Sequence, residues 1–274
     1  MSIAAVHAAK DDRIRLVSQE NIGVAAARNS GWQLAHSDLL AFIDADDLWA
    51  PPTKIERQLE VMLAGGERVG LVYTWFDVID EQNFVRFRPR GRSISGDVLD
   101  QVLRGNFVCN GSSPLIRRMA LLEIGGYDPG LLKCGVHGCE DMLIYYRIAR
   151  QFHFALVPEH LTGYRVASQR MSRNCPRMFA SFRAVADEMI AAYPRCKPII
   201  DSGIRCYLRY LIGEAVAFQD FAQVRPLLSP WVREHPLDLI TLPLHVVALK
   251  VAFPLRWTIR TIFGSPFRGK KRDF

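Results

Sequence analysis

The sequence predicts an α/β fold in which helices alternate with the strands of a mostly parallel sheet. Short apolar runs, such as residues 39–43, alternate along the chain with longer segments of helical periodicity. That order is typical of domains in which helices flank a sheet. The composition agrees, because 49% hydrophobic and 23% charged residues in a chain of 274 are ordinary for a folded protein with one large core.

The first half of the chain supplies the clearest alternation. We expect strands at residues 14–18, 39–43 and 69–75, and helices at residues 21–35 and from Pro51 or Pro52 onward. The run at residues 39–43 is apolar throughout, which favours a strand buried on both faces. Proline is tolerated in the first turn of the second helix. The buried side of that helix is predicted to carry Ile55, Leu59, Met62 and Leu63.

The second half predicts shorter elements, followed by two long helices. Short helices are expected at residues 97–104, 119–124 and 141–151, and short strands at residues 115–117, 154–157 and 163–166. From Pro176 onward, apolar residues recur at helical spacing in two segments. Their predicted packing residues include Phe179, Phe182, Val185, Met189, Ile204, Leu208 and Leu211. We therefore expect an α/β domain over residues 1–175 and a helical C-terminal region over residues 176–274.

Residues 237–263 form the most apolar stretch of the chain, and a basic tail follows them. Pro243, Lys250 and Arg256 interrupt the stretch, which argues against a helix that spans a membrane. Segments that are both basic and apolar often lie on an anionic membrane surface. Two interpretations stay open, a helix on such a surface and a helix buried in the protein.

The formal net charge of +7 indicates an anionic partner, either a phosphate-bearing substrate or an anionic membrane surface. We expect no nucleic acid partner, because the lysines and arginines are scattered and form no stripe with aromatic residues. The first ten residues lack the pattern of a secretory signal peptide. The expected location is cytoplasmic, with a peripheral position at the inner face of the cell membrane as an option.

None of the six cysteines forms a C-x-x-C pair, so reduced thiols are expected. A zinc site at Cys134, His137 and Cys139 is the less favoured alternative. Such a site would need a further pair of ligands, which the spacing does not supply.

A cluster of carboxylates follows the predicted strand at residues 39–43. Asp44, Asp46 and Asp47 stand where this strand would end, and ligands of open α/β sheets bind at that edge. Clustered carboxylates repel one another unless a cation neutralises them, and Mg²⁺ or Mn²⁺ commonly joins a carboxylate to a diphosphate. The turn therefore indicates a metal-diphosphate site. The alternative is an acidic turn in which Asp47 caps the next helix.

Two further patterns indicate a functional site only in combination with this turn. Glu140 and Asp141 open a predicted helix, whose N-terminal dipole favours an ionised carboxylate and so suits a general base. Arg28 stands in the predicted helix at residues 21–35, from which it could reach a phosphate. Taken alone, helix capping and a solvated arginine are the better explanations.

The order of these patterns is more specific than any one of them. N-x-G-x-A-A-A-R-N at residues 21–29, D-A-D-D-x-W at 44–49, G-G-Y-D at 125–128 and E-D at 140–141 follow one another. In this order the chain resembles glycosyltransferase family 2 from about Arg13 to Arg173. The resemblance implies the GT-A fold, which is Rossmann-like with a mostly parallel sheet flanked by helices.

The same resemblance implies an inverting transfer of a sugar from a nucleotide diphosphate sugar to an acceptor hydroxyl. UDP-sugars are the usual donors, Mn²⁺ or Mg²⁺ the usual cofactor, and a glycan or lipid-linked molecule the usual acceptor. Surface polysaccharide or glycolipid assembly is a common setting for such enzymes.

Site roles also follow from the resemblance. Asp141 is the expected catalytic base, and Asp46 is the expected metal ligand. For Trp49, packing in the core is an equally good explanation. The expected substrate-binding residues are Arg28, Asp44, Glu140, Trp49 and Arg165.

The chain departs from the family pattern at its start. Family members open with a strand, a helix, a second strand and an acidic turn that holds the nucleobase, whereas residues 14–18 match their third strand. We therefore expect a domain truncated at its N-terminus by one to two βαβ pieces of ~30 residues each.

Two other functions stay open at this point. An inactive remnant, or a membrane-associated non-catalytic binding subunit, is the alternative that the departure permits. A phosphatase with an aspartate nucleophile in Asp44-Ala45-Asp46 is less favoured, because Leu48 stands where such an enzyme would have Thr or Val.

Overall fold

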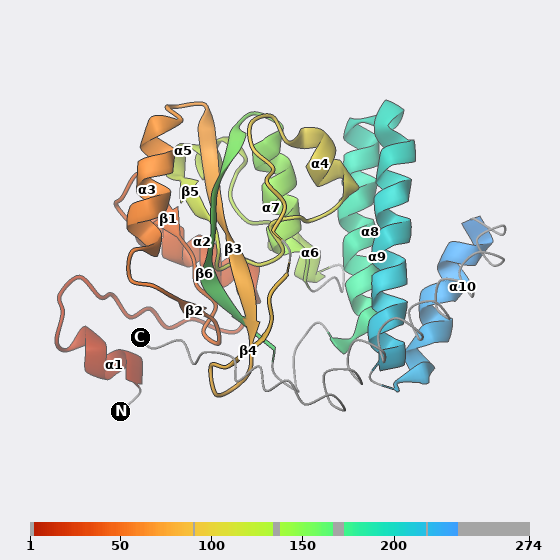
Figure 1. The fold of residues 1–274 in the computed structure, drawn as a ribbon, viewed down its shortest axis with the longest axis horizontal. Coiled ribbons are helices and arrows are strands. Elements are labelled where there is room, and N and C mark those ends of the chain that lie inside the picture. Colours follow the sequence, from red (N-terminus) through yellow and green to blue (C-terminus); the bar gives the residue numbers. More distant parts are fainter. Residues whose placement is uncertain (1–2, 90, 134–137, 167–172, 218, 235–274) are drawn as a thin grey trace.

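The computed structural model describes residues 3–89, 91–133, 138–166, 173–217 and 219–234, in which helices surround one sheet (Figure 1). The strands of the sheet are β1 (Leu39–Ala41), β2 (Leu48–Trp49), β3 (Val69–Ile79), β4 (Val85–Phe87), β5 (Leu115–Arg117) and β6 (His153–Arg165). The α-helices are α1 (Ile3–Ala8), α2 (Val24–Leu34), α3 (Lys54–Ala64), α4 (Leu99–Arg104), α5 (Arg118–Glu123), α6 (Gly130–Lys133), α7 (Glu140–Ala149), α8 (Cys175–Ala192), α9 (Lys197–Ala217) and α10 (Val224–Glu234). The expected α/β fold is confirmed.

The sheet is mixed, so the expectation of a mostly parallel sheet is wrong. Its strand order is β1-β5-β3-β6-β2, with β4 paired to β3. The long β3-β6 pairing is parallel, whereas the other described pairings are antiparallel. Two of these antiparallel pairings come from β5, which the chain inserts between β1 and β3 and which runs antiparallel to both, and the others come from β2 and β4. β1 and β3 therefore point the same way, but β5 separates them.

Most predicted elements are present, with two exceptions among the strands. Residues 14–18 form no strand, and Leu16 and Val17 are 58% and 52% exposed. A strand needs a neighbour that takes its backbone hydrogen bonds, and none of the described strands pairs with this segment. The strands predicted at residues 154–157 and 163–166 are one strand, β6, because residues between them also pair with β3.

β3 is buried on both faces, which explains its continuous apolar sequence. Leu71 and Tyr73 point into the larger core, which includes residues of α4, α7, α8 and α9, while Val72 points into a smaller core with residues of α3. In Figure 1, α3 accordingly lies on one side of the sheet and α7 on the other. β1 is anchored in the same way, with Leu40 in the larger core and Leu39 against the smaller one.

The helical C-terminal part is present as predicted. α8 and α9 pack side by side (Figure 1). The predicted packing residues are buried, namely Phe179, Phe182, Val185, Met189, Ile204, Leu208 and Leu211. Among the described helices, none combines the length and the hydropathy that a membrane span requires. Residues 237–263 lie outside the described residues, and the domain division at residue 175 stays a prediction.

The buried side of α3 is rotated by one residue from the predicted side. It carries Lys54, Gln58 and Met62 at four-residue spacing. Leu59 and Leu63, which were expected there, are 37% and 66% exposed. The neighbouring sheet and loop present backbone carbonyls to this side, and a buried carbonyl without a donor costs about 1–3 kcal/mol. Polar side chains that satisfy these carbonyls therefore outcompete leucine.

Lys54 is a buried cation that no described carboxylate neutralises. Its ammonium group donates to Gln58 Oε1 at 2.7 Å and to the carbonyl of Ser113 at 3.1 Å. It also lies 4.5 Å from the centre of the Trp49 ring. Burial lowers the pKa of Lys54 to about 7, because loss of water disfavours the charged form.

Replacement of Lys54 by methionine should help stability more at pH 6 than at pH 9. The folded protein binds fewer protons than the unfolded chain between about pH 7 and the ordinary lysine pKa of 10.5. The cost of burying this lysine is therefore full below pH 7 and fades as the pH rises. Thermal melts measure this effect as the Tm of Lys54→Met minus the Tm of wild type. This difference should be more positive at pH 6 than at pH 9, by about 2–4 °C for each kcal/mol of additional stabilisation.

The exposed Lys10 offers a matched control. Lys10→Met should shift Tm by the same small amount at both pH values. A Tm difference for Lys54→Met that stays constant from pH 6 to pH 9 would contradict the lowered pKa.

Candidate active site

β1 delivers three aspartates to the edge of the sheet. The strand ends at Ala41, and the chain then turns so that the Asp47 N–H donates to the carbonyl of Asp44 at 3.0 Å. In this acidic turn (residues 44–47), Asp44 and Asp47 are half-buried and Asp46 is exposed. The predicted placement of the carboxylates just beyond the strand is confirmed.

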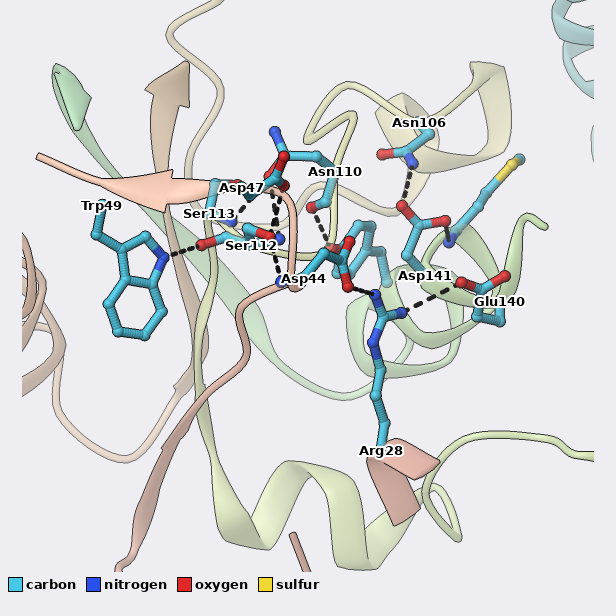
Figure 2. A network of polar contacts seen from close by, with 12 residues as sticks. Arg28, Asp44, Asp47, Trp49, Asn106, Asn110, Ser112, Ser113, Glu140 and Asp141 are labelled. Atoms are coloured by element: carbon cyan, nitrogen blue, oxygen red, sulfur yellow. Dashed lines mark hydrogen bonds and ion pairs between the residues drawn. The ribbon is translucent and has the colours of Figure 1, made fainter. Parts of the chain in front are cut away.

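One buried arginine connects the acidic turn to the start of α7. Arg28 on α2 is 9% exposed and donates to Asp44 Oδ1 at 2.6 Å and to Glu140 Oε1 at 3.2 Å (Figure 2). Burial alone would lower the pKa of Arg28, but Tyr127 and the two carboxylates raise it well above its ordinary value. The residues predicted from separate motifs, Arg28, Asp44 and Glu140, therefore gather at one place.

Asp141 lies beside this ion-pair network in the first turn of α7. Its Oδ1 accepts from the Met142 N–H at 2.7 Å, and its Oδ2 accepts from Asn106 Nδ2 at 3.4 Å. Burial and the negative charge of Glu140 raise the pKa of Asp141, and Arg28 offsets them only in part. The helix N-terminus was expected to keep this carboxylate ionised, but desolvation outweighs that effect and moves the pKa toward neutral pH.

The loop between α4 and β5 holds the acidic turn in place, and the sequence prediction did not include it. Ser112 Oγ accepts from the Asp44 N–H at 2.9 Å and donates to Asp47 Oδ2 at 2.7 Å. Asn110 Oδ1 accepts from the N–H groups of Ser112 and Ser113 at 3.1 and 2.9 Å, which orders the loop itself. The available signal was the N-G-S-S run at residues 110–113, which is typical of a turn.

The same loop packs against Arg28 and α7. A Cβ atom on Gly111 would lie 2.5 Å from a terminal nitrogen of Arg28, so glycine allows the backbone to approach the guanidinium. The hydroxyl of Tyr145 on α7 donates to the carbonyl of Asn110 at 2.7 Å. The loop therefore contacts the acidic turn, Arg28 and α7 together.

The G-G-Y-D motif is clamped to α2 by a side-chain amide. Asn29 Nδ2 donates to the carbonyl of Tyr127 at 2.7 Å, and Asn29 Oδ1 accepts from the Tyr127 N–H at 2.9 Å. Gly126 has a φ of 76°, and a Cβ there would lie 2.8 Å from Asn29 Oδ1. Glycine is therefore required both by conformation and by space. The clamp places the Tyr127 ring 5.4 Å from the Arg28 guanidinium carbon.

Trp49 and Arg165, both predicted to bind substrate, contact the protein itself. Trp49 Nε1 donates to the carbonyl of Ser112 at 2.7 Å. The Arg165 N–H donates to Asp47 Oδ1 at 2.8 Å, and its guanidinium donates to the carbonyl of Asp46 at 2.5 Å and to two groups of the β3-β4 turn. Arg165 therefore braces the acidic turn, and Trp49 braces the loop between α4 and β5. A contact of either residue with substrate stays a prediction.

Asp46 is the residue best placed to hold a cation. Its carboxylate is exposed, and within the described part of the chain it takes part in no hydrogen bond or ion pair. The described residues contain no group of three or more Asp, Glu, His or Cys side chains arranged to bind a metal. Mg²⁺ is commonly held by one or two carboxylates together with substrate phosphates, so Asp46 beside Asp44 fits a cation that arrives with a diphosphate. Cys134 and His137, the less favoured zinc ligands, lie outside the described residues.

A cleft of about 450 Å³ lies between α2 and the segment that runs from β1 into the acidic turn. Most of its lining is apolar, including Val24, Trp32 and Phe42, but Arg28 and Asp44 also line it. β1 is an edge strand of the described sheet. The cleft therefore brings an apolar surface next to two charged groups of the ion-pair network.

Known proteins resemble this chain in sequence. A family model described as "Glycosyltransferase like family 2" matches residues 3–201. An uncharacterized glycosyltransferase of Nostoc sp., alr2836, is 30% identical over 168 residues, which cover 59% of this chain and 50% of that protein. The UDP-Glc:alpha-D-GlcNAc-diphosphoundecaprenol beta-1,3-glucosyltransferase WfgD of Escherichia coli is 33% identical over 76 residues, which cover 27% of this chain and 29% of that protein. The chain thus spans about half the length of the Nostoc relative.

A solved structure is similar in fold. It is the mannosyltransferase PcManGT from Pyrobaculum calidifontis in complex with GDP-Man and Mn²⁺, with a TM-score of 0.50 and 17% sequence identity. The similarity covers 90% of this chain and 72% of the mannosyltransferase chain. It supports the GT-A fold with a helical C-terminal part. Because the family model covers most of the chain and the four motifs meet around Arg28, the chain belongs to glycosyltransferase-like family 2.

Proposed function

We propose that this protein is an inverting glycosyltransferase that moves a sugar from a nucleotide diphosphate sugar to an acceptor hydroxyl. The observation that carries the proposal is the Arg28 bridge, which ties Asp44 in the acidic turn to Glu140, the neighbour of Asp141. One end of this ion-pair network thus lies in a turn suited to a metal, and the other end lies next to a carboxylate suited to act as a base. Membership of the family supports the transferase reaction as such.

On the donor side, Asp46 would hold Mn²⁺ or Mg²⁺ beside the diphosphate. When bound, such a cation stabilises the negative charge of the departing nucleoside diphosphate. Arg28 binds the carboxylate of Asp44, and Ser112 accepts a hydrogen bond from its N–H. Asp44 is therefore held in one position on this side of the site. The solved mannosyltransferase contains GDP-Man and Mn²⁺, and the E. coli relative is named for UDP-Glc. Both support a nucleotide diphosphate sugar, and a UDP-sugar is the donor we propose.

On the acceptor side, Asp141 would take the proton of the attacking hydroxyl. The Met142 N–H orients its carboxylate at 2.7 Å. Burial and Glu140 raise its pKa, and a base is most effective when its pKa lies close to the working pH. The deprotonated oxygen then attacks the anomeric carbon as the bond to the diphosphate breaks on the opposite side, which inverts the configuration.

The proposed acceptor is a glycan or a lipid-linked sugar. The name of the E. coli relative describes a sugar on diphosphoundecaprenol as its acceptor, which supports an acceptor carried on a membrane lipid. The net charge of +7 suits an anionic membrane surface. We therefore propose a cytoplasmic protein that works at the inner face of the membrane in surface polysaccharide or glycolipid assembly.

Asp141→Asn should abolish transfer and leave donor binding intact. The amide has the shape of the carboxylate but cannot accept a proton, so the rate should fall by roughly 10²- to 10⁴-fold. Release of nucleoside diphosphate from UDP-glucose or GDP-mannose with Mn²⁺ measures turnover, and isothermal titration measures donor binding. Glu140→Gln is the matched control, because it removes the adjacent charge and keeps the base, and its loss should be smaller. Turnover by Asp141→Asn at the wild-type rate would remove Asp141 as the base.

Asp46→Asn should weaken donor binding only when the metal is present. In titrations with UDP-glucose and with GDP-mannose, the Kd with Mn²⁺ should rise roughly tenfold or more, about 1.4 kcal/mol, while the Kd in EDTA should not change. Asp38→Asn is the control, since Asp38 is an exposed carboxylate just before the other end of β1. Equal metal-dependent affinities for the two variants would rule out Asp46 as the ligand. Wild-type protein that shows no metal-dependent binding would instead support the non-catalytic alternative.

A further inference from the structure

The candidate base is held by two hydrogen-bond donors, one on each carboxylate oxygen. The Met142 N–H donates to Asp141 Oδ1 at 2.7 Å, and Asn106 Nδ2 donates to Asp141 Oδ2 at 3.4 Å (Figure 2). The first donor belongs to the same helix as the base. The second comes from the loop after α4, which sequence analysis assigned no role.

The side-chain amide of Asn106 can face Asp141 in only one orientation. Asn106 Oδ1 accepts from the Cys109 N–H at 2.9 Å, and Cys109 has a φ of 75° that closes this turn of the loop. An amide flipped by 180° would lose that bond and would point its oxygen at a carboxylate. Because the Cys109 N–H is a donor only, it fixes the amide with its nitrogen toward Asp141.

We propose that Asn106 is a positioning residue that orients the Asp141 carboxylate and favours its ionised form. This inference rests on the proposed function, in which Asp141 takes the acceptor proton. The Asn106 bond is long, whereas the Met142 bond is short, so Oδ2 is the oxygen held less tightly. It is therefore the oxygen available to the acceptor hydroxyl, and hydrogen bonds at such positions commonly tighten when substrate binds.

A neutral donor suits this position because the surroundings of Asp141 already contain several charges. Burial and the negative charge of Glu140 raise the pKa of Asp141, while Arg28 lowers it. An amide N–H stabilises the carboxylate without adding a further charge that Asp44 or Glu140 would attract. The titratable groups that face Asp141 come from α2, the acidic turn, the loop before β5, the loop between α5 and α6, the residue before α7, α7 itself and α9. They are Arg28, Asp44, Cys109, Tyr127, Cys139, Glu140, Tyr145 and Tyr207.

Two variants of Asn106 separate this role from a role in loop structure alone. Asn106→Asp keeps an oxygen for the Cys109 N–H but turns a second carboxylate toward Asp141. Asn106→Ala removes both contacts. If Asn106 served only the loop, Asn106→Ala would destabilise the loop but leave the titration midpoint of Asp141 unchanged. If Asn106 positions the base, both variants raise that midpoint, and Asn106→Asp, which keeps the loop contact, raises it more.

The titration of Asp141 can be followed directly by NMR in the full chain labelled with ¹³C at aspartate side-chain carboxyls, with Asp141→Asn to identify the signal. We expect the midpoint to rise by about 1 pH unit in Asn106→Ala and by more in Asn106→Asp, where the two carboxyls titrate as a pair. An Asp141 midpoint equal to the wild-type value in either variant would overturn the proposal. This measurement needs no substrate, so its outcome does not depend on whether the transferase function is correct.

A kinetic measurement then links the titration to catalysis. With UDP-glucose or GDP-mannose and Mn²⁺, the acidic limb of the kcat profile should move to higher pH in the same order, alanine and then aspartate, while the KM for donor stays within about twofold of wild type. Loss of donor affinity with an unmoved acidic limb would show a structural effect on the site and would count against the positioning role. If the NMR midpoints shift and no turnover is found with any variant, the proposed function fails while the effect of Asn106 on Asp141 stands.

Discussion

The two ion pairs of Arg28 are the interaction on which the rest of the site depends. Asp44, Glu140 and Asp141 bring negative charge into a partly buried region, where like charges repel strongly. Arg28 supplies the compensating positive charge from α2, at 2.6 Å from Asp44 and 3.2 Å from Glu140. Removing one partner of a buried pair leaves the other uncompensated and is strongly destabilising. Arg28 therefore links the acidic turn directly to the start of α7.

The three aspartates of the acidic turn occupy three different environments, which separates their roles. Asp44 pairs with Arg28. Asp47 accepts from the Arg165 N–H and from the Ser112 hydroxyl, while burial raises its pKa to about 6. Asp46 is exposed. Of the three, the exposed carboxylate has the least to lose on binding a cation, whereas the other two keep the turn in shape.

Backbone groups provide much of the support around the charged side chains. The loop between α4 and β5 approaches Arg28 through Gly111, and it binds the acidic turn through Ser112. Asn29 clamps the backbone of Tyr127 with both ends of its amide. These contacts are anchored in turn by a sheet that has a packed core on each face. Such support limits how far the candidate base and the acidic turn can move relative to each other.

The sequence by itself determined the α/β class, the two C-terminal helices and the choice of Arg28, Asp44, Glu140 and Asp141 as candidate site residues. The class and the helices follow from hydrophobic periodicity, and the candidate residues follow from four short motifs whose order resembles glycosyltransferase family 2. Both are properties of the sequence that do not depend on the folded structure. The mixed direction of the sheet, the polar buried side of α3 and the role of the loop at residues 106–113 were decided by tertiary structure alone. Each depends on which backbone donors and acceptors face one another after folding, as the carbonyl of Ser113 faces Lys54. Residues this far apart in sequence show no pattern that predicts a hydrogen bond between them. Their donors and acceptors come to face one another only after the strands and loops have packed.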